Sequence, residues 1–396
     1  MNKKRIISLI GGILLILVIF FISFSIQSCS KKRNVYQFEG GKTIPIAYNP
    51  DNFSPLDAFI SDIKIVPLET NDNCLIGNRL HGVKVHQDLI YINSSMNHLL
   101  VFDLNGEFMR EIGKRGQGPG EFQVINDFIF TDEGTIEILD FRKIESYNME
   151  GKHIGTVKRF DFNGKDLYLN PDNFCRSFSS GYYLWGGVMG LRDERLREKS
   201  SMMYRVNNEM QIDNAYFDTK YGDGGHKERF KHYQDKILIT ASPLDYNVYQ
   251  IDSNDSISIR YTFNFGKYGF DINKDMDRKT IDYKSYIYGM NEFQETDRFL
   301  YFWFKYQNRG VLSLLYSKST EQAFFQSFVP SDNGKEIRLF PPKATHHDRL
   351  IAIVEVFALK LDLERMSSEN IKKWGLEAFH KLDDEDNPVL IFYNVK

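Results

Sequence analysis

Short runs of alternating apolar and polar residues recur along this chain at a regular distance. The motif Phe102–Phe108 returns 45 residues later as Tyr147–His153, and an apolar run precedes each copy, at 89–92 and 136–139. Alternation over four to eight residues predicts half-buried strands, and the Asn-Gly and Glu-Gly pairs within the motifs predict hairpin turns. Each unit is therefore expected to hold four short strands.

A repeat of 40 to 50 residues with four strands is typical of a β-propeller blade. Hairpin signals recur at 206–209, 251–255 and 316–320, and residues 56–396 leave room for six such units. We therefore predict an all-β fold, a six-bladed β-propeller. Its blades are expected near residues 75–118, 120–165, 172–222, 228–268, 283–330 and 335–396.

The last predicted blade is interrupted by a helical pattern. Residues 361–382 carry apolar side chains at helical spacing, and Ser367 is a suitable N-cap. We expect one amphipathic helix inserted here, on the outside of the blade. Residues 389–395 then return as a strand that needs a partner, and residues 63–68 are predicted to pair with it and close the ring.

The N-terminus has the features of an export signal. A basic start at residues 3–5 precedes an apolar stretch from Ile6 to Phe24, and Ile26-Gln27-Ser28-Cys29 looks like a lipobox with Cys29 as the lipidated residue. The predicted organisation is a lipoprotein signal peptide at 1–28, a linker at 29–55 and the propeller at 56–396. The apolar stretch is also long enough for an uncleaved membrane anchor. Both interpretations tether the propeller to a membrane.

Charge and cysteine content narrow the function classes. Residues 1–28 carry three cations and no acids, so the remainder has 47 Lys and Arg against 53 Asp and Glu. This acidic balance argues against nucleic acid as a partner. Cys74 and Cys175 are expected to be buried thiols, and no metal-binding spacing or cofactor motif is present. His346 and His347 would face opposite ways on a strand, which makes them poor joint ligands.

Three segments resemble a known family. Residues 61–70, the glycine-rich loop at 113–122 and residues 387–390 are similar to the six-bladed β-propeller lipoproteins of Bacteroidetes, relatives of NHL-repeat propellers. The resemblance implies fold, export and lipid anchoring in the bacterial cell envelope, and no particular reaction. Cys29 is not followed by an acidic run, which favours a protein that faces the periplasm, on the inner or the outer membrane.

Candidate ligand-binding residues cluster where the chain enters the predicted innermost strands. Cations recur there in several blades, and converging cations would attract an acidic ligand. The candidates are Arg79, Arg176, Arg229, Lys231 and Arg338. Arg115 and Glu121 flank the glycine-rich loop, which is expected to connect one blade to the next rather than to cradle phosphate, because a strand follows it.

We interpret the chain as a non-enzymatic protein that binds an acidic glycan, a peptide or an envelope protein, or that acts as a scaffold. The alternative is a propeller enzyme of the lactonase, lyase or glycosidase type. Its acids would converge from several blades, with Asp127, Glu292 and His346 as examples near inner strands.

Overall fold

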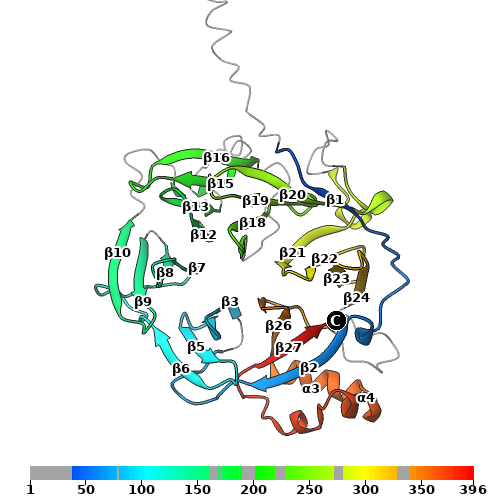
Figure 1. Ribbon diagram of the computed structural model, residues 1–396. Helices are drawn as coiled ribbons and strands as arrows, with labels where there is room; N and C mark the ends of the chain where they lie inside the picture. The colour runs from blue at the N-terminus through cyan, green and yellow to red at the C-terminus, as the bar shows by residue number, and fades with distance from the viewer. Residues whose placement is uncertain are drawn as a thin grey trace, which may run out of the picture. The chain divides into compact units, whose positions relative to one another are not determined.

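Six sheets surround a common axis, which confirms the predicted six-bladed propeller (Figure 1). Each sheet has four antiparallel strands, and one of them carries a fifth, parallel strand at its edge. The computed structural model describes residues 38–77, 80–141, 143–159, 168–169, 171–186, 188–189, 201–218, 228–271, 280–327 and 339–396. Apart from two outermost strands that come from the start of the described chain, the strands of each blade follow one another in chain order from the axis outwards (Figure 1).

The first three blades lie within the ranges predicted from the repeat. Their strands are β3 (Leu80–His86), β4 (Leu89–Ser94), β5 (Leu99–Asp103) and β6 (Phe108–Ile112), then β7 (Asp127–Phe130), β8 (Thr135–Asp140), β9 (Lys143–Asn148) and β10 (His153–Arg159), then β12 (Asn173–Arg176), β13 (Tyr182–Trp185), β15 (Ser201–Val206) and β16 (Ile212–Asp218). A separate pair is formed by β11 (Tyr168–Leu169), which precedes the third blade in sequence, and β14 (Val188–Met189), which falls between β13 and β15.

The other three blades complete the ring. Their strands are β17 (Phe230–Tyr233), β18 (Lys236–Thr240), β19 (Asn247–Ile251) and β20 (Ile257–Asn264), then β21 (Tyr288–Glu295), β22 (Phe299–Lys305), β23 (Val311–Ser317) and β24 (Ala323–Ser327), then β25 (Ala344–His346), β26 (Arg349–Val354), β27 (Val389–Val395) and β2 (Ile60–Pro67). Short 3₁₀ turns occur at Leu56–Ala58, Gly266–Tyr268 and Tyr283–Ser285.

The ring is closed by the predicted pairing of residues 63–68 with residues 389–395, which gives the last blade its fourth strand. β2, from the start of the described chain, pairs antiparallel with β27 from its end, with Ile63 opposite Tyr393 and Ile65 opposite Ile391. β27 also pairs with β26, so it is an inner member of the last blade and binds both ends of the chain into one sheet. Pairing in this way removes the free edge that an open ring would present.

Part of the expected linker belongs to the propeller. β1 (Lys42–Pro45) runs parallel to β20 and adds a fifth strand to the outer edge of the fourth blade. Ile44, Ile46 and Tyr48 are buried there. The strand is short and lies among polar residues, so its alternating pattern was not recognised in the sequence. The predicted linker, residues 29–55, therefore includes a strand of the propeller.

The helical insertion lies outside the last blade, beside β2 (Figure 1). Two helices, α3 (Val356–Arg365) and α4 (Ser368–Lys373), replace the single helix expected at 361–382, and a 3₁₀ turn follows at Glu377–Lys381. Ser367 caps α4 as predicted, because its side chain accepts a hydrogen bond from the backbone N–H of Asn370. The extended backbone of Met366 separates the helices.

Aromatic and aliphatic side chains fill the spaces between blades, where most of the buried aromatic residues lie. Cys74 and Cys175 are buried free thiols, as expected. In the part of the chain that the structure describes, no helix is long and apolar enough to cross a membrane. The predicted signal peptide and Cys29 lie outside that part.

Candidate functional site

Six charged side chains from five of the six blades converge around the axis of the ring, and we call them the central cluster. Lys84 lies on β3, Asp127 begins β7, Lys231 lies on β17 and Glu292 lies on β21. The other two members are Glu228, two residues before β17, and Lys343, directly before β25. All six therefore lie on, or close to the start of, an innermost strand.

Each lysine of the cluster meets a carboxylate. Lys84 Nζ lies 2.8 Å from Asp127 Oδ1 and also donates to the carbonyl of Phe128. Lys343 Nζ lies 2.9 Å from Glu292 Oε1. Lys231 is paired with Glu228, three residues before it. The formal charges of the six side chains cancel.

Glu228 has a special place in the cluster because it spans the axis. Its side chain is 5% exposed, and a Cβ added to Gly82, on the opposite blade, would lie 3.8 Å from its Oε1 atom. Within the described residues, this buried Oε1 has no hydrogen-bond partner, whereas Oε2 is bound by Lys231. A buried carboxylate oxygen without a partner is costly, so a donor that reached it would be bound favourably.

Burial and neighbouring charges have opposite effects on the pKa values of the residues in the cluster. Burial lowers the pKa of Lys231, but the carboxylates of Glu228 and Glu292 outweigh it, and the pKa is raised above 10.5. Burial raises the pKa of Asp127, opposed by the charge and hydrogen bond of Lys84. The charged forms thus depend on one another across several blades.

The cluster is not sealed from solvent. The side chain of Lys343 is 38% exposed, and those of Lys84 and Glu292 are 20% and 15% exposed. A ligand in solution can therefore reach part of the cluster.

The predicted ring of arginines differs from what the structure places at the axis. Arg79 and Arg338 lie outside the described residues. Arg176 ends β12 instead of preceding it, and its guanidinium is bound by Glu137 Oε1 at 2.6 Å and Glu133 Oε2 at 3.0 Å. Arg176 is therefore occupied by protein carboxylates and holds the second blade to the third.

The remaining candidates divide between structural contacts and the central cluster. Arg229 is buried, lies over the ring of Trp185 and donates to the carbonyls of Thr240 and Ala241. Lys231 belongs to the cluster. Arg229 stands directly before the strand that begins at Phe230, whereas Lys231 lies within that strand.

Glu121 and Arg115 lie on the loop that joins β6 to β7, which is a connection between blades as predicted. Glu121 Oε2 accepts the backbone N–H of Gly118 at 2.8 Å, so this carboxylate already occupies the amide that an anion would seek. Arg115 is exposed on the same loop.

Sequence reasoning missed Lys84, Glu228 and Lys343. Lys343 stands directly before β25, where Arg338 had been chosen because the strand was expected to begin earlier. Of the three residues named for an enzyme, Asp127 and Glu292 do lie in the cluster, each paired with a lysine. His346 ends β25 and binds Asp88 instead.

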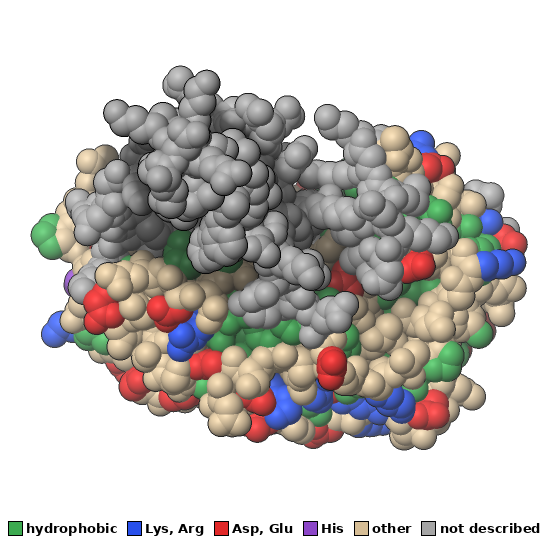
Figure 2. Space-filling view, turned by 90° about the horizontal axis from the view of Figure 1, so that it is seen from above, with side chains coloured by type: hydrophobic (Ala, Val, Ile, Leu, Met, Phe, Trp, Pro, Cys, Tyr) green, Lys and Arg blue, Asp and Glu red, His purple; other side chains and the backbone are tan. Residues whose placement is uncertain are grey.

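On the face seen in Figure 2, acidic and basic side chains of the described residues are interspersed, without a large patch of one sign. Nucleic-acid binding proteins usually present a basic patch or stripe.

Comparison with known proteins identifies the family. Residues 41–394 match the family model described as "Domain of unknown function (DUF4934)". The chain belongs to the DUF4934 family. No curated protein matches this DUF4934 chain.

Among solved structures, a Bacteroides fragilis protein whose name suggests export is similar over 90% of this chain and 100% of its own, at 17% identity with a TM-score of 0.69. At this identity the likeness shows the fold alone. A Xanthomonas campestris gluconolactonase (12% identity, 90% of this chain and 98% of its own) has a TM-score of 0.43 and carries no argument about function.

Proposed function

We propose that this DUF4934 protein is a lipid-anchored, non-enzymatic binding protein of the bacterial cell envelope, facing the periplasm, that holds a polar ligand at the central cluster. The observation that carries the proposal is the buried Oε1 atom of Glu228, which has no hydrogen-bond partner among the described residues. The lipobox at Cys29 supports the anchor, and the basic start of the chain supports export.

The charges of the cluster favour a neutral ligand over the acidic one expected from sequence. Three lysines are each neutralised by a carboxylate, so an anion would gain little net attraction. Glu228 Oε1 can accept a hydrogen bond from a donor group of a ligand. An ammonium group could donate this bond, but the three lysines of the cluster would repel its positive charge. A neutral sugar brings hydroxyl groups that donate to Glu228 and accept from Lys343 without adding charge.

A binding role also suits the pairing of the acids. A general acid or base needs access to its substrate and a pKa near the working pH. Asp127 and Glu292 are both held by lysines, and His346 points to another part of the molecule. No specific observation favours the lactonase, lyase or glycosidase alternative.

An array of neutral and acidic glycans, probed with the full chain in detergent, tests the proposal. We expect selective binding of neutral glycans, and a loss of about tenfold in affinity for Glu228→Gln, since a hydrogen bond to a charged acceptor contributes about 1.5 to 3 kcal/mol and one to a neutral acceptor about half as much. Glu121→Gln, on the loop between blades, is the matched control and should bind as the native chain does.

Three outcomes would reject this proposal. If the chain bound only acidic glycans, the result would favour the cationic binding site that was expected from the sequence. If the chain bound a peptide or an envelope protein and no glycan, the ligand would belong to a different class from the one proposed. Equal affinity of Glu228→Gln and the native chain would remove the central cluster from the site.

A further inference from the structure

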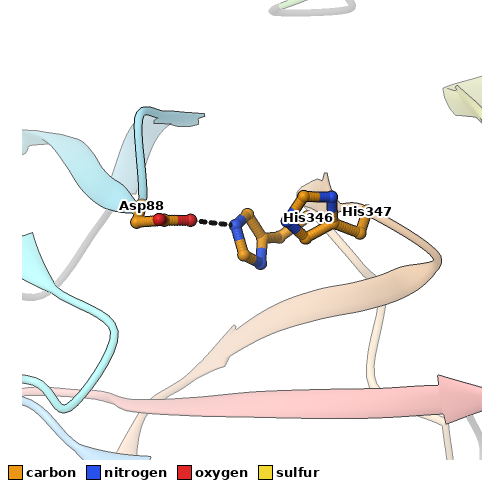
Figure 3. Close-up of side chains that lie close together, drawn as sticks. All are labelled: Asp88, His346 and His347. Carbon is orange, nitrogen blue, oxygen red and sulfur yellow. Dashed lines mark hydrogen bonds and ion pairs between the residues drawn. The ribbon is translucent and has the colours of Figure 1, made fainter.

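A second group of side chains lies apart from the central cluster, where the first blade meets the last. Asp88, His346 and His347 each offer one ligand atom, and these atoms all lie within 4.8 Å of one another (Figure 3). Asp88 belongs to the turn between β3 and β4, and the two histidines lie at the turn between β25 and β26. In the part of the chain that the structure describes, this is the one group of three or more such residues.

The turn between β25 and β26 explains why both imidazoles share one side, contrary to the expectation that neighbouring strand residues point apart. His346 is the last residue of β25, but His347 has a positive φ of 53° and has already left the strand. The two rings lie with their centroids 4.3 Å apart. Asp88 also has a positive φ, 60°, which places its carboxylate opposite them.

The contacts of His346 show how the group is held together. Its Nε2 atom lies 2.6 Å from Asp88 Oδ1, and its Nδ1 atom lies 2.8 Å from Nη2 of Arg349. The side chain of His346 is 9% exposed, whereas that of Asp88 is 73% exposed. The group thus combines one fixed imidazole with two solvent-exposed side chains that can adjust.

We propose that Asp88, His346 and His347 bind a transition-metal cation of the Zn²⁺ type and thereby clamp the first blade to the last. Two imidazoles and one carboxylate form a donor set that suits zinc, copper or nickel, whereas calcium and magnesium take oxygen ligands. Three protein ligands leave one position open to water. Ligand atoms of a tetrahedral zinc lie about 3.3 Å apart, and the three ligand atoms here already lie within 4.8 Å of one another.

Charge at the turn supports a cation. Asp88 and the neighbouring Asp348 bring two negative charges, against one positive charge from Arg349. Arg349 itself is retained by other contacts, since its guanidinium lies over the ring of Phe392, 5.4 Å from the centroid.

Arg349 also sets the strength of the site. A guanidinium only donates, so Nδ1 of His346 accepts and Nε2 carries the proton that faces Asp88. When a metal binds at Nε2 of His346, the proton moves to Nδ1. The Nδ1–H group and the guanidinium of Arg349 are then both donors, so Arg349 must move away from the imidazole. Metal-bound histidines normally donate their other N–H to an acceptor. Replacement of Arg349 by a residue with an acceptor should therefore strengthen metal binding.

Calorimetric titration of the full chain with Zn²⁺ alone tests this inference. The protein is prepared in detergent without a histidine tag, which would itself bind zinc. We expect one Zn²⁺ per chain, a loss of tenfold or more in affinity for Asp88→Asn and for His347→Ala, and a gain of about tenfold or more for Arg349→Gln. Zn²⁺ should also raise the melting temperature of the native chain and leave that of His347→Ala unchanged.

His98→Gln is the matched control, because His98 forms a histidine–carboxylate pair with Glu111 at 2.5 Å on another part of the surface. This variant should bind Zn²⁺ as the native chain does. The inference is overturned if the native chain binds no stoichiometric Zn²⁺, or if Asp88→Asn and His347→Ala, shown to be folded by their melting curves, bind it unchanged. The glycan assay is independent of this result.

Discussion

Glu228 and Gly82 face each other across the axis of the ring, from the fourth and the first blades. A Cβ placed on Gly82 would lie 3.8 Å from Glu228 Oε1, and atoms of Phe128 and Asn93 would lie 3.9 Å and 4.0 Å away. Gly82 does not have a positive φ, so its backbone accepts a side chain without strain. This relationship offers a way to obstruct the central cluster without removing any charge.

Arg176 is expected to stabilise the fold and to leave ligand binding unaffected. Arg176→Met would strand the carboxylate of Glu137, whose side chain is fully buried. Because the guanidinium is 39% exposed, we expect a loss of about 2 to 3 kcal/mol in the free energy of unfolding, below the range for a fully buried pair. Denaturant unfolding measures this loss.

The double variant Arg176→Met with Glu137→Gln removes the stranded charge and should recover most of that stability. No recovery would show that the loss comes from packing. If folded Arg176→Met bound the glycan more weakly than the native chain, Arg176 would instead belong to the ligand-binding site, as the sequence predicted.

Gly116 is required by the loop between the first two blades. A Cβ there would lie 1.9 Å from Oε2 of Glu121, which accepts the N–H of Gly118. Gly116→Ala should therefore displace Glu121 and cost about 1 to 3 kcal/mol, seen as a lower melting temperature. Gly155→Ala is the control, since nothing lies within 4 Å of the added Cβ, and its melting temperature should barely change. Equal melting of the two variants would refute the role of Glu121 in the loop.

His86 should make the fold sensitive to mild acid. Burial lowers its pKa below the ordinary 6.5, so the unfolded chain binds this proton more readily than the folded chain does. The contribution of His86 is present above pH 6.5 and is lost as the pH falls through that value towards the folded pKa. His86→Phe, which can keep the stacked contact with Phe130, should lose less stability than the native chain between about pH 7.5 and 5.5. Parallel pH profiles for the two proteins would contradict this assignment.

Cys29 is expected to carry the lipid anchor. Cys29→Ala should abolish incorporation of a labelled fatty acid and leave the protein unprocessed, because the thiol is the acceptor in the lipobox. Gel analysis of labelled cells measures both effects. Cys74→Ala is the control and should be labelled normally, since Cys74 is buried in the propeller. Unchanged labelling of Cys29→Ala would contradict lipidation at Cys29, and a native chain that takes up no label would support the uncleaved anchor.

Sequence periodicity predicted the blades because strand spacing and hairpin turns are local features. The pairing of Ile63 with Tyr393 was also accessible, since a four-strand count left β27 without a partner. Helix boundaries were less accurate: the helix was expected to begin at residue 361, but α3 begins at Val356, and Val356, Leu359 and Leu363 are buried along it.

The central cluster could not be obtained in the same way. Asp127 meets Glu228 and Lys231 only because two blades far apart in the sequence converge on the axis, and sequence spacing does not record which side of a blade each residue faces. A shift of a few residues in one strand boundary was enough to select Arg338 in place of Lys343. The histidine pair was misjudged because a single positive φ at His347 depends on a hairpin whose position was not predicted.

Titration of a neutral glycan selected on the array against Gly82→Leu tests the central claim most directly. Leucine at this position would extend towards Glu228, so we expect the affinity to fall by about tenfold or more while the protein remains folded. Gly155→Leu, on the outer strand β10 with no atom within 4 Å of its Cβ, should bind the glycan as the native chain does. Native affinity in folded Gly82→Leu, or an equal loss in both variants, would contradict a ligand site at the central cluster.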